Sequence, residues 1–320
     1  MDSAFTRRVA ALLERVEDGL QQAARADTAF ASEAAGHVIA AGGKRFRPGL
    51  VVTSALLGQD PNDDDIVKAS LVVELTHVAS LYHDDVMDEA QLRRGAPSAN
   101  RRYGNSVAIL IGDLLFSRAS SVVATLGTDY VALQAATFAR LVQGQLWETI
   151  GPAADVDRLE HYLRVVADKT GSLIATSAVF GGMVAGLSAA ELDALDKFGE
   201  EIGVVFQLSD DVIDITSAVS GKTPGTDLRA GVPTLPTLLA QRSAGPGDAR
   251  LMELLSRPLA DEAEVGEALA LLRAHPGLEE ARREIGRRSE LARGYLAPLP
   301  AGEARDALEA MCDAVVDRLA

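Results

Sequence analysis

Two groups of aspartates have the spacing of a site that binds metal ions and phosphate. The first consists of Asp84, Asp85 and Asp88, which close a largely apolar stretch. Arg93 and Arg94 follow within one further turn or loop. On an α-helix residues four apart lie one above the other, so Asp84 and Asp88 share a face. Carboxylates held so close favour a bridging hard cation such as Mg²⁺, and arginines match phosphate oxygens two at a time. This stretch therefore predicts a metal ion and a polyanion.

The second group is Asp210, Asp211 and Asp214, and Gln207 precedes it on the same predicted helix face. One such motif alone is as well explained by a solvated acidic face. Two motifs that each close an apolar helix favour a shared site, because a helix bundle brings such ends to the mouth of a central cavity. Six carboxylates are then expected to face one another, ringed by the cations Lys44, Arg47, Arg93, Arg94, Lys169 and Lys222. Metal-bridged diphosphate is the ligand that satisfies both signs of charge.

Helices are the elements expected to position these residues. Aromatic residues make up only 4% of the chain, alanine and leucine are abundant, and period-two strand patterns are absent. Apolar residues recur at helical spacing from about Ile66 to Ala90, which carries the first motif, and from Glu191 to Asp214, which carries the second. We therefore predict an all-α protein, with residues 1–320 forming one large helical bundle around a central active-site cavity.

Two weaker signals lie near the first motif. The loop from Gly42 to Pro48 combines two glycines with Lys44 and Arg47 and could face an anion, although a basic surface loop is the alternative. His77 lies two turns before Asp84 on roughly the same face. Its position is compatible with a ligand-binding histidine and with an ordinary helix histidine.

Two further segments have contrasting interpretations. The segment 221–236 is rich in glycine and proline, contains Lys222, and is long for a simple connection, so it predicts a lid. The acidic run 63–65 directly precedes an apolar periodic stretch. Acidic residues at that place are typical of a helix N-terminus, so no metal is assigned to them.

Composition and charge restrict the class of protein. The 320 residues carry a net charge of −15, which argues against nonspecific nucleic-acid binding and requires local cations around an anionic substrate. The single cysteine, Cys312, allows no intrachain disulfide and fits a reducing cytoplasm. Residues 1–20 have no apolar signal core, and no window comes near the ~20 apolar residues of a spanning helix. Any membrane contact is expected to be peripheral.

The chain resembles the trans-isoprenyl diphosphate synthases, and among them the bacterial long-chain polyprenyl diphosphate synthases. Matching segments occur in the family's order and are Gly42 to Pro48, His77 to Gly95, Lys169-Thr170, Phe206 to Asp214 and Gly221 to Pro236. The resemblance implies an isoprenoid-synthase bundle that condenses an allylic diphosphate with isopentenyl diphosphate. It further implies Mg²⁺ as cofactor and a homodimer as the usual assembly.

Roles of single residues follow from the same resemblance. Asp84, Asp88 and Asp210 are expected to hold Mg²⁺ ions that bind the allylic diphosphate, supported by Asp85, Asp211 and Asp214. Arg93, Lys169 and Lys222 are expected to contact that diphosphate, and Thr170 and Gln207 to lie beside the allylic cation and oxygen. Isopentenyl diphosphate is assigned to Lys44, Arg47, His77 and Arg94. Val232 departs from the pattern, since many members of the family have a lysine there, and Arg229 or Lys222 could compensate.

Product length is predicted from the residues below the first motif. In the resembled family the positions four and five before the first aspartate form the upper wall of the product tunnel, and here they are Ser80 and Ala79. Ser80 lies roughly 6 Å and Thr76 roughly 12 Å below Asp84 along the helix. Small side chains at these depths leave room for about six to ten isoprene units, the length of a quinone side chain. A phenylalanine at Ala79 or Ser80 should shorten the product.

Four alternatives remain open at this stage. A farnesyl or geranylgeranyl diphosphate synthase is one alternative, although in the resembled family short-chain members tend to have an aromatic residue at one of the two positions occupied here by Ala79 and Ser80. A class I terpene cyclase shares the fold and the first motif, but usually has a second metal motif of Asn/Ser/Glu type. A noncatalytic subunit of a heteromeric synthase loses acidic residues, whereas this chain has all six. The remaining alternative is a helical protein with solvated acidic faces.

Overall fold

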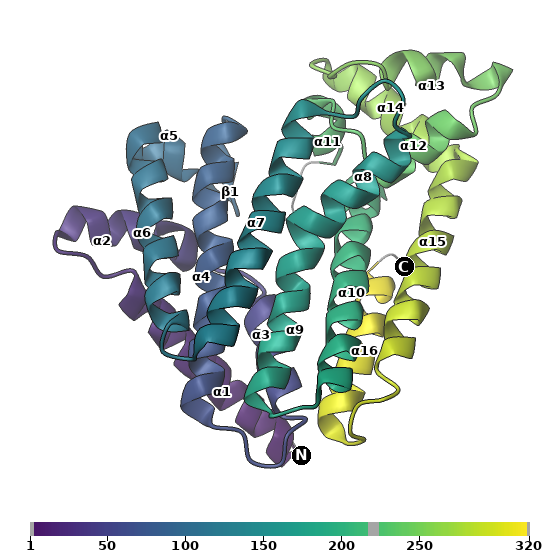
Figure 1. Ribbon diagram of the computed structural model, residues 1–320. Coiled ribbons are helices and arrows are strands. Elements are labelled where there is room, and N and C mark those ends of the chain that lie inside the picture. Colours follow the sequence, from purple (N-terminus) through teal and green to yellow (C-terminus); the bar gives the residue numbers. More distant parts are fainter. Residues whose placement is uncertain (1–2, 217–223, 319–320) are drawn as a thin grey trace. The chain divides into compact units, whose positions relative to one another are not determined.

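The structure is a computed structural model that describes residues 3–216 and 224–318. Within these ranges nearly every regular element is a helix, and Figure 1 shows the helices in chain order. The first elements are α1 (Ala4–Ala23), α2 (Ala29–Ala40), α3 (Phe46–Ala55), α4 (Asp63–Met87), β1 (Leu92–Arg93), β2 (Ala96–Pro97), α5 (Ala99–Tyr103), α6 (Asn105–Val123) and α7 (Thr128–Ile150). The next are α8 (Arg158–Val166), the π-helix η1 (Ala167–Gly171), α9 (Ser172–Val184), α10 (Ala189–Thr216), α11 (Thr226–Ala230) and α12 (Leu235–Arg242). The last are the 3₁₀-helix η2 (Pro246–Asp248), α13 (Ala249–Leu254), α14 (Glu262–Ala274), α15 (Pro276–Tyr295) and α16 (Glu303–Asp317).

The all-α prediction is confirmed. The chain divides into two compact units. The first unit comprises residues 1–138, 173–196 and 298–308, and the second comprises residues 139–172, 197–297 and 309–320. Each unit has an apolar core of its own, one built mainly from α1, α2, α4 and α6 and the other from the helices between residues 215 and 272. The single domain over residues 1–320 stays a prediction, as does its central cavity.

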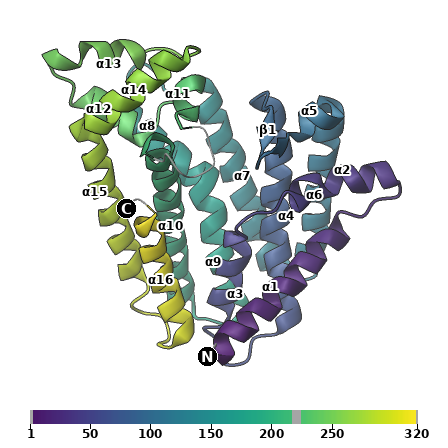
Figure 2. The ribbon, with the colours of Figure 1, turned by 180° about the vertical axis from the view of Figure 1, so that it is seen from behind.

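Helix α4 is the central element of the first unit. Its first turn is capped by Asn62, whose side-chain oxygen accepts from the backbone amides of Asp64 and Asp65. Acidic residues fill that turn, where the helix dipole stabilises them, and two of them pair with arginines of α1. The helix therefore starts three residues earlier than expected, and it ends at Met87 with Asp88 as its C-cap. Figure 2 shows α1 and α3 beside α4.

The packing of α6 against α4 depends on a glycine. A Cβ at Gly112 would lie 2.3 Å from His83 Nε2 and 3.2 Å from the carbonyl oxygen of Ala79. A side chain at this position would therefore require His83 to move and would press against the backbone of α4. The contact buries Ala79 completely, together with the α6 residues Ala108, Ile111 and Leu115.

One helix departs from the expectation about membrane spans. α6 is long and apolar enough to cross a membrane by length and composition, with a mean hydropathy of 1.5 and 33% of the window buried. The prediction that no stretch approaches the length and hydropathy of a spanning helix is therefore wrong for residues 105–123. The described residues contain no second helix of this kind.

A short hairpin follows the first acidic motif and was not predicted. Leu92 pairs with Pro97 and Arg93 with Ala96, and the two residues between the strands, Arg94 and Gly95, both have positive φ. Two left-handed residues form the tight turn whose twist matches that of antiparallel strands. The hairpin thus fixes the directions in which the two arginines leave the chain.

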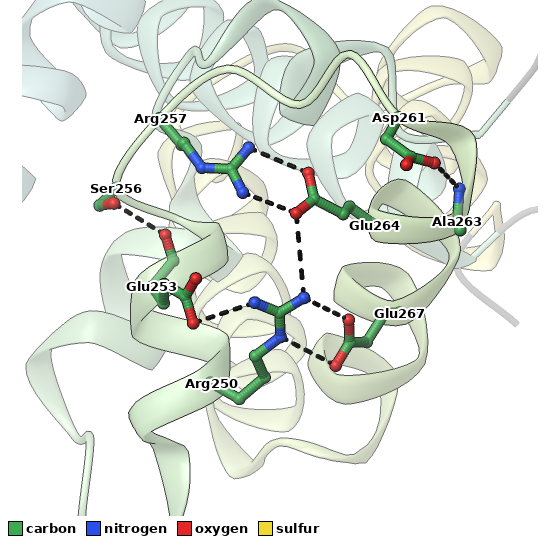
Figure 3. A network of polar contacts seen from close by, with 8 residues as sticks. All are labelled: Arg250, Glu253, Ser256, Arg257, Asp261, Ala263, Glu264 and Glu267. Atoms are coloured by element: carbon green, nitrogen blue, oxygen red, sulfur yellow. Dashed lines mark hydrogen bonds and ion pairs between the residues drawn. The ribbon is translucent and has the colours of Figure 1, made fainter.

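In the second unit, a network of ion pairs joins α13 to α14 (Figure 3). Arg250 contacts Glu253 at 2.9 Å and Glu267 at 2.8 Å, and Arg257 contacts Glu264 at 2.7 Å. These side chains are largely exposed to solvent, so each pair contributes little to stability. The network fits a structural role on the surface of this unit.

Candidate active site

Asp85 is the buried member of the first acidic motif. Its side chain is fully buried, and its Oδ1 accepts from Arg93 Nη2 at 2.6 Å and from Arg93 Nε at 2.7 Å. Its second oxygen accepts from the backbone amide of Ala99 at 3.3 Å. Asp85 therefore anchors the hairpin arginine and the start of α5 to the end of α4. This contact fits the supporting role expected for Asp85. It also shows that Arg93, which is expected to contact the allylic diphosphate, is bound by a carboxylate of the protein itself.

We expect Arg93→Gln to lower the free energy of unfolding by about 3 kcal/mol, because it leaves a buried carboxylate without its counter-charge. Asp85→Asn in the same protein should recover part of that loss, since the uncompensated charge is then removed. Urea unfolding followed by circular dichroism measures both effects.

The matched control is Arg15→Gln, which breaks an ion pair with Asp64 on the same helix. The Asp64 side chain is 72% exposed, so we expect a change below about 1 kcal/mol. Equal losses from Arg93→Gln and Arg15→Gln would contradict the anchoring role of Asp85.

Three of the four residues assigned to isopentenyl diphosphate lie together in the first unit. His77 of α4 lies close enough to Arg47 and Arg94 for both guanidinium charges to act on it. Arg94 packs over the glycine loop, where a Cβ at Gly43 would lie 3.0 Å from its guanidinium. Lys44 belongs to the same loop and is exposed. The loop and the hairpin turn thus bring cations to one place, as an anion-binding site requires.

The electrostatics of this cluster favour a bound anion. Burial lowers the pKa of Arg47 to about 10, Glu74 opposes that shift, and Arg94 adds to it. Burial, followed by the charges of Arg47 and Arg94, also holds the pKa of His77 well below its usual range. Like charges gathered in a site of low dielectric are costly, and a diphosphate offsets that cost.

The residue that fixes the shape of this loop was missed by the sequence analysis. Arg45 has a left-handed backbone with φ of 47°, unusual for a residue other than glycine. Its guanidinium donates to Glu17 at 2.8 Å, to buried Glu74 at 3.2 Å and to the carbonyl oxygen of Ile39 at 3.1 Å. These bonds hold the strained residue in place between Lys44 and Arg47. The only sequence signal was that Arg45 is a cationic residue within this loop. Its acidic partners, Glu17 and Glu74, lie far away in the sequence.

The pKa shift of His77 gives a pH dependence of stability. An unfolded histidine binds a proton near pH 6.5, whereas folded His77 stays neutral to lower pH, so the unfolded chain binds more protons as the pH falls. Neutral His77 therefore contributes to the free energy of unfolding above the pKa of an unfolded histidine, and that contribution decreases as the pH falls below this value. From about pH 7.5 to about pH 5.5 we expect the melting temperature to fall further in the wild type than in His77→Gln. Parallel thermal unfolding profiles of the two proteins would contradict the depressed pKa.

Four of the catalytic residues predicted in the second unit line one cavity. The cavity has a volume of about 320 Å³, and Lys169, Thr170, Gln207 and Asp211 contribute to its wall. Lys169 and Thr170 lie in the π-helix η1, an irregular turn of a kind often found at functional sites. Lys169 is ion-paired with Glu148 of α7, also in the wall. Gly171 is the last residue of η1.

Asp211 is the buried member of the second acidic motif. It accepts hydrogen bonds from the Tyr162 hydroxyl, from Gln207 Nε2 at 3.2 Å and from the backbone amide of Leu235 at 3.3 Å. Burial raises its pKa to about 6, although these three hydrogen bonds oppose the shift. Asp211 therefore joins α8, α10 and the start of α12. Tyr162 was missed by the sequence analysis, and its only sequence signal is the spacing of two helical turns before Lys169.

The other residues of the second motif have different surroundings. Asp214 accepts from the backbone amides of Thr226 and Asp227, both at 3.2 Å, and so caps α11. Asp210 is half-buried and does not line the cavity. Lys222 lies outside the described residues. Val232 lines the cavity and is 43% exposed.

Arg229 was suggested as a compensation for Val232. It is engaged with Glu262 at 2.7 Å and with the carbonyl oxygen of Pro224 at 2.6 Å. These contacts commit its guanidinium to the protein surface and to the segment before α11. Whether cationic closure of this segment occurs through Arg229 stays a prediction.

Each motif by itself offers carboxylate oxygens of the kind that Mg²⁺ binds. Each motif has one buried carboxylate, Asp85 or Asp211, committed to protein donors, and Asp214 caps a helix. Asp84, Asp88 and Asp210 are accessible to different degrees and present oxygen donors. Among residues 3–216 and 224–318, no group of three or more His, Cys, Asp or Glu side chains is arranged to hold a metal alone. Mg²⁺ typically binds one or two carboxylates and completes its shell with water and substrate phosphate, which agrees with such a set.

Ala79 and Ser80, the residues predicted to set product length, have different environments. Ala79 is completely buried in the contact between α4 and α6. Ser80 is half-buried, and its hydroxyl donates to the carbonyl oxygen of His77 at 2.8 Å. Tyr82 is fully buried and donates to the carbonyl oxygen of Ala34 at 2.5 Å, so its hydroxyl points to α2. One turn below Ser80, Gln134 of α7 donates to Thr76 at 3.4 Å.

Comparisons with known proteins identify the family to which the chain is similar. Residues 28–272 match the family model described as polyprenyl synthetase. The chain is 48% identical over 319 residues to a nonaprenyl diphosphate synthase of Mycobacterium tuberculosis, covering 99% of this chain and 95% of that protein. It is 41% identical over 277 residues to a dimethylallyltranstransferase of the same organism, covering 87% of this chain and 85% of that protein. Among solved structures, the chain is similar to a geranylgeranyl pyrophosphate synthase of Corynebacterium glutamicum, which is complexed with calcium and isoprenyl diphosphate. The TM-score is 0.89 at 43% sequence identity, and the match covers 99% of this chain and 98% of that one.

The fold and these matches define a prenyltransferase of the isoprenoid-synthase type. The chain belongs to the polyprenyl synthetase family.

Proposed function

We propose that this protein is an all-trans polyprenyl diphosphate synthase that adds isopentenyl diphosphate repeatedly to an allylic diphosphate and makes a long product. The observation that carries the proposal is the end of α4. The same helix bears the carboxylates Asp84 and Asp88 at its end and His77 of the cation cluster two turns earlier. A metal-bound diphosphate and a metal-free diphosphate can therefore be recognised within one unit.

The reaction begins with heterolysis of the allylic carbon–oxygen bond, and the diphosphate leaves with the electron pair. The double bond of isopentenyl diphosphate then attacks the allylic carbon, and a proton is lost to the released diphosphate. In this proposal Arg47, His77 and Arg94 hold the isopentenyl diphosphate and orient its double bond. Thr170 and Gln207 lie beside the allylic cation and oxygen.

Mg²⁺ is proposed as the cofactor, held by Asp84, Asp88 and Asp210. When bound, it supplies charge neutralisation at the departing diphosphate. The calcium in the related Corynebacterium structure supports a divalent ion. Asp85, Asp211 and Asp214 keep the neighbouring chain segments in place, while Arg93, Lys169 and Lys222 are proposed to contact the allylic diphosphate.

Product length separates the two leading versions of this function. The likeness to the nonaprenyl diphosphate synthase and the small Ser80 support about six to ten isoprene units. The likeness to a geranylgeranyl pyrophosphate synthase keeps a shorter product as the second candidate. The test is incubation of the purified chain with labelled isopentenyl diphosphate, Mg²⁺ and each allylic primer in turn, followed by chromatography. Products that stop at farnesyl or geranylgeranyl diphosphate would overturn the long-chain assignment.

The same experiment separates two other classes of protein. A terpene cyclase releases pyrophosphate from an allylic diphosphate without isopentenyl diphosphate, whereas a synthase requires both. A noncatalytic subunit shows no turnover alone, whereas this chain by itself should be active with Mg²⁺.

A homodimer is proposed as the assembly. In the first unit α6 exposes Ile109 and Leu110, which are 41% and 64% exposed, and α7 exposes Phe138, whose ring lies 4.5 Å from that of Phe116. Apolar side chains grouped in this way are typical of an interface. Light scattering should give twice the chain mass for the wild type, and Leu110→Glu should shift it toward the monomer. A wild type with the mass of one chain would reject the proposal.

The remaining partner assignments are also proposals. We propose a cytoplasmic enzyme, supported by the single buried Cys312, with peripheral membrane contact for product release. Burial raises the pKa of Cys312 to about 11, so its thiol stays protonated and inert. No nucleic-acid partner is proposed.

A further inference from the structure

The C-terminal turn of the second unit reaches the second acidic motif. Arg318 follows the end of α16, and its Nη2 donates to Asp210 Oδ1 at 2.5 Å. Its guanidinium also lies 5.2 Å from the centre of the Phe206 ring, one turn before Asp210 on α10. The side chains of Arg318 and Asp210 are 27% and 37% exposed, so this ion pair is partly shielded from water. Arg318 lies beyond the residues that match the family model.

Other contacts hold the end of α16 in the position from which Arg318 reaches α10. The carbonyl oxygen of Cys312 accepts from the Ser289 hydroxyl of α15 at 3.0 Å, and Asp313 pairs with Arg293 of the same helix. Cys312 and Val315 are buried. The last turns of α16, which lead into Arg318, are therefore fixed against α15.

The geometry points to a competition for Asp210. We propose that Arg318 acts as an internal cation on this carboxylate and that a divalent ion must displace it in order to bind the second motif. A guanidinium and a metal ion cannot share the same carboxylate oxygen at contact distance, because their charges repel. Nη1 of Arg318 is buried without a hydrogen-bond partner, so its present position leaves one donor unsatisfied and lowers the cost of moving. The inference rests on the proposed role of Asp210 as a metal ligand.

Arg318 is thus a positioning residue for the metal site. With the guanidinium in place, Asp210 is neutralised and its oxygen is directed toward the C-terminal turn. Once displaced, the guanidinium can turn to the diphosphate oxygens that arrive with the metal, which restores its hydrogen bonds. Metal loading of the second motif is then coupled to release of the C-terminal turn from α10.

The test is direct metal binding, with Mn²⁺ as the probe and the free ion measured by electron paramagnetic resonance. Removing the competitor in Arg318→Gln should tighten the weaker class of Mn²⁺ sites by about 3- to 10-fold, as expected for a partly exposed ion pair. Arg318→Lys should bind with intermediate affinity. Arg287→Gln, which removes the same charge from a pair with Glu284 on α15, is the matched control and should leave Mn²⁺ affinity unchanged.

Asp210→Asn separates failure of this inference from failure of the proposed function. If Asp210→Asn does not reduce Mn²⁺ binding, Asp210 is not a metal ligand and the proposed role is wrong. If it does reduce binding but Arg318→Gln leaves affinity unchanged or weakens it, the competition is wrong while the metal site stands. In the Asp210→Asn background, Arg318→Gln should have no further effect on Mn²⁺ affinity.

Discussion

Replacing Asp84 by Asn is expected to lower kcat/KM for chain elongation by about 10³-fold, equivalent to about 4 kcal/mol of transition-state stabilisation. The side chain keeps its size and its place at the end of α4, so the loss reports the missing charge. Charge develops on the departing diphosphate, and a carboxylate that holds its counter-ion matters most at that step. Incorporation of labelled isopentenyl diphosphate at saturating allylic primer measures the effect.

The same substitution elsewhere on α4 serves as the control. Asp64 lies in the first turn of the helix and pairs with Arg15 at 2.5 Å on the surface. We expect Asp64→Asn to cost less than about 1 kcal/mol of stability and to leave kcat/KM unchanged. If Asp84→Asn keeps activity near that of Asp64→Asn, the first motif is a solvated acidic face and not a metal site.

The fold class and the position of the first motif could be predicted because both depend on local pattern. Helical spacing of apolar residues favours helices through local geometry, before any tertiary contact is known. The end of α4 was placed three residues too late, at Ala90, because periodicity does not reveal the C-cap. The helix stops at Met87, Asp88 becomes the cap, and Glu89 adopts a left-handed φ of 48°.

The division of labour within each acidic triplet could not be predicted from geometry alone. Spacing places three carboxylates at one helix end but leaves open which of them faces the protein interior. Burial commits Asp85 to Arg93 and Asp211 to Tyr162. Tyr162 lies 49 positions before Asp211, and Arg318 lies 108 positions after Asp210. Partners this far apart leave no periodic signal in the sequence, so only the packed chain shows them.

The second large effect is expected on product length, and the structure separates the two residues that the sequence treated alike. Ser80 is half-buried one turn below Asp84, so Ser80→Phe adds a ring on an accessible face of α4. In the proposed tunnel that ring blocks the growing chain, and the main product should shorten to about three or four isoprene units, because the barrier lies only one helical turn below the first motif. Chromatography of the products, with primer and Mg²⁺ held constant, measures the change.

Ala79→Phe is the contrasting variant. Ala79 is fully buried against α6, and even a Cβ at Gly112 would lie 3.2 Å from its carbonyl oxygen. A phenylalanine there overpacks the core and should lower the free energy of unfolding by about 1–3 kcal/mol, while Ser80→Phe should change it less. Shortening by Ala79→Phe with unchanged stability would place the tunnel wall on the α6 side of α4. Because Ser80 and Ala79 point to different sides of one helix, the two variants together identify the face along which the product grows.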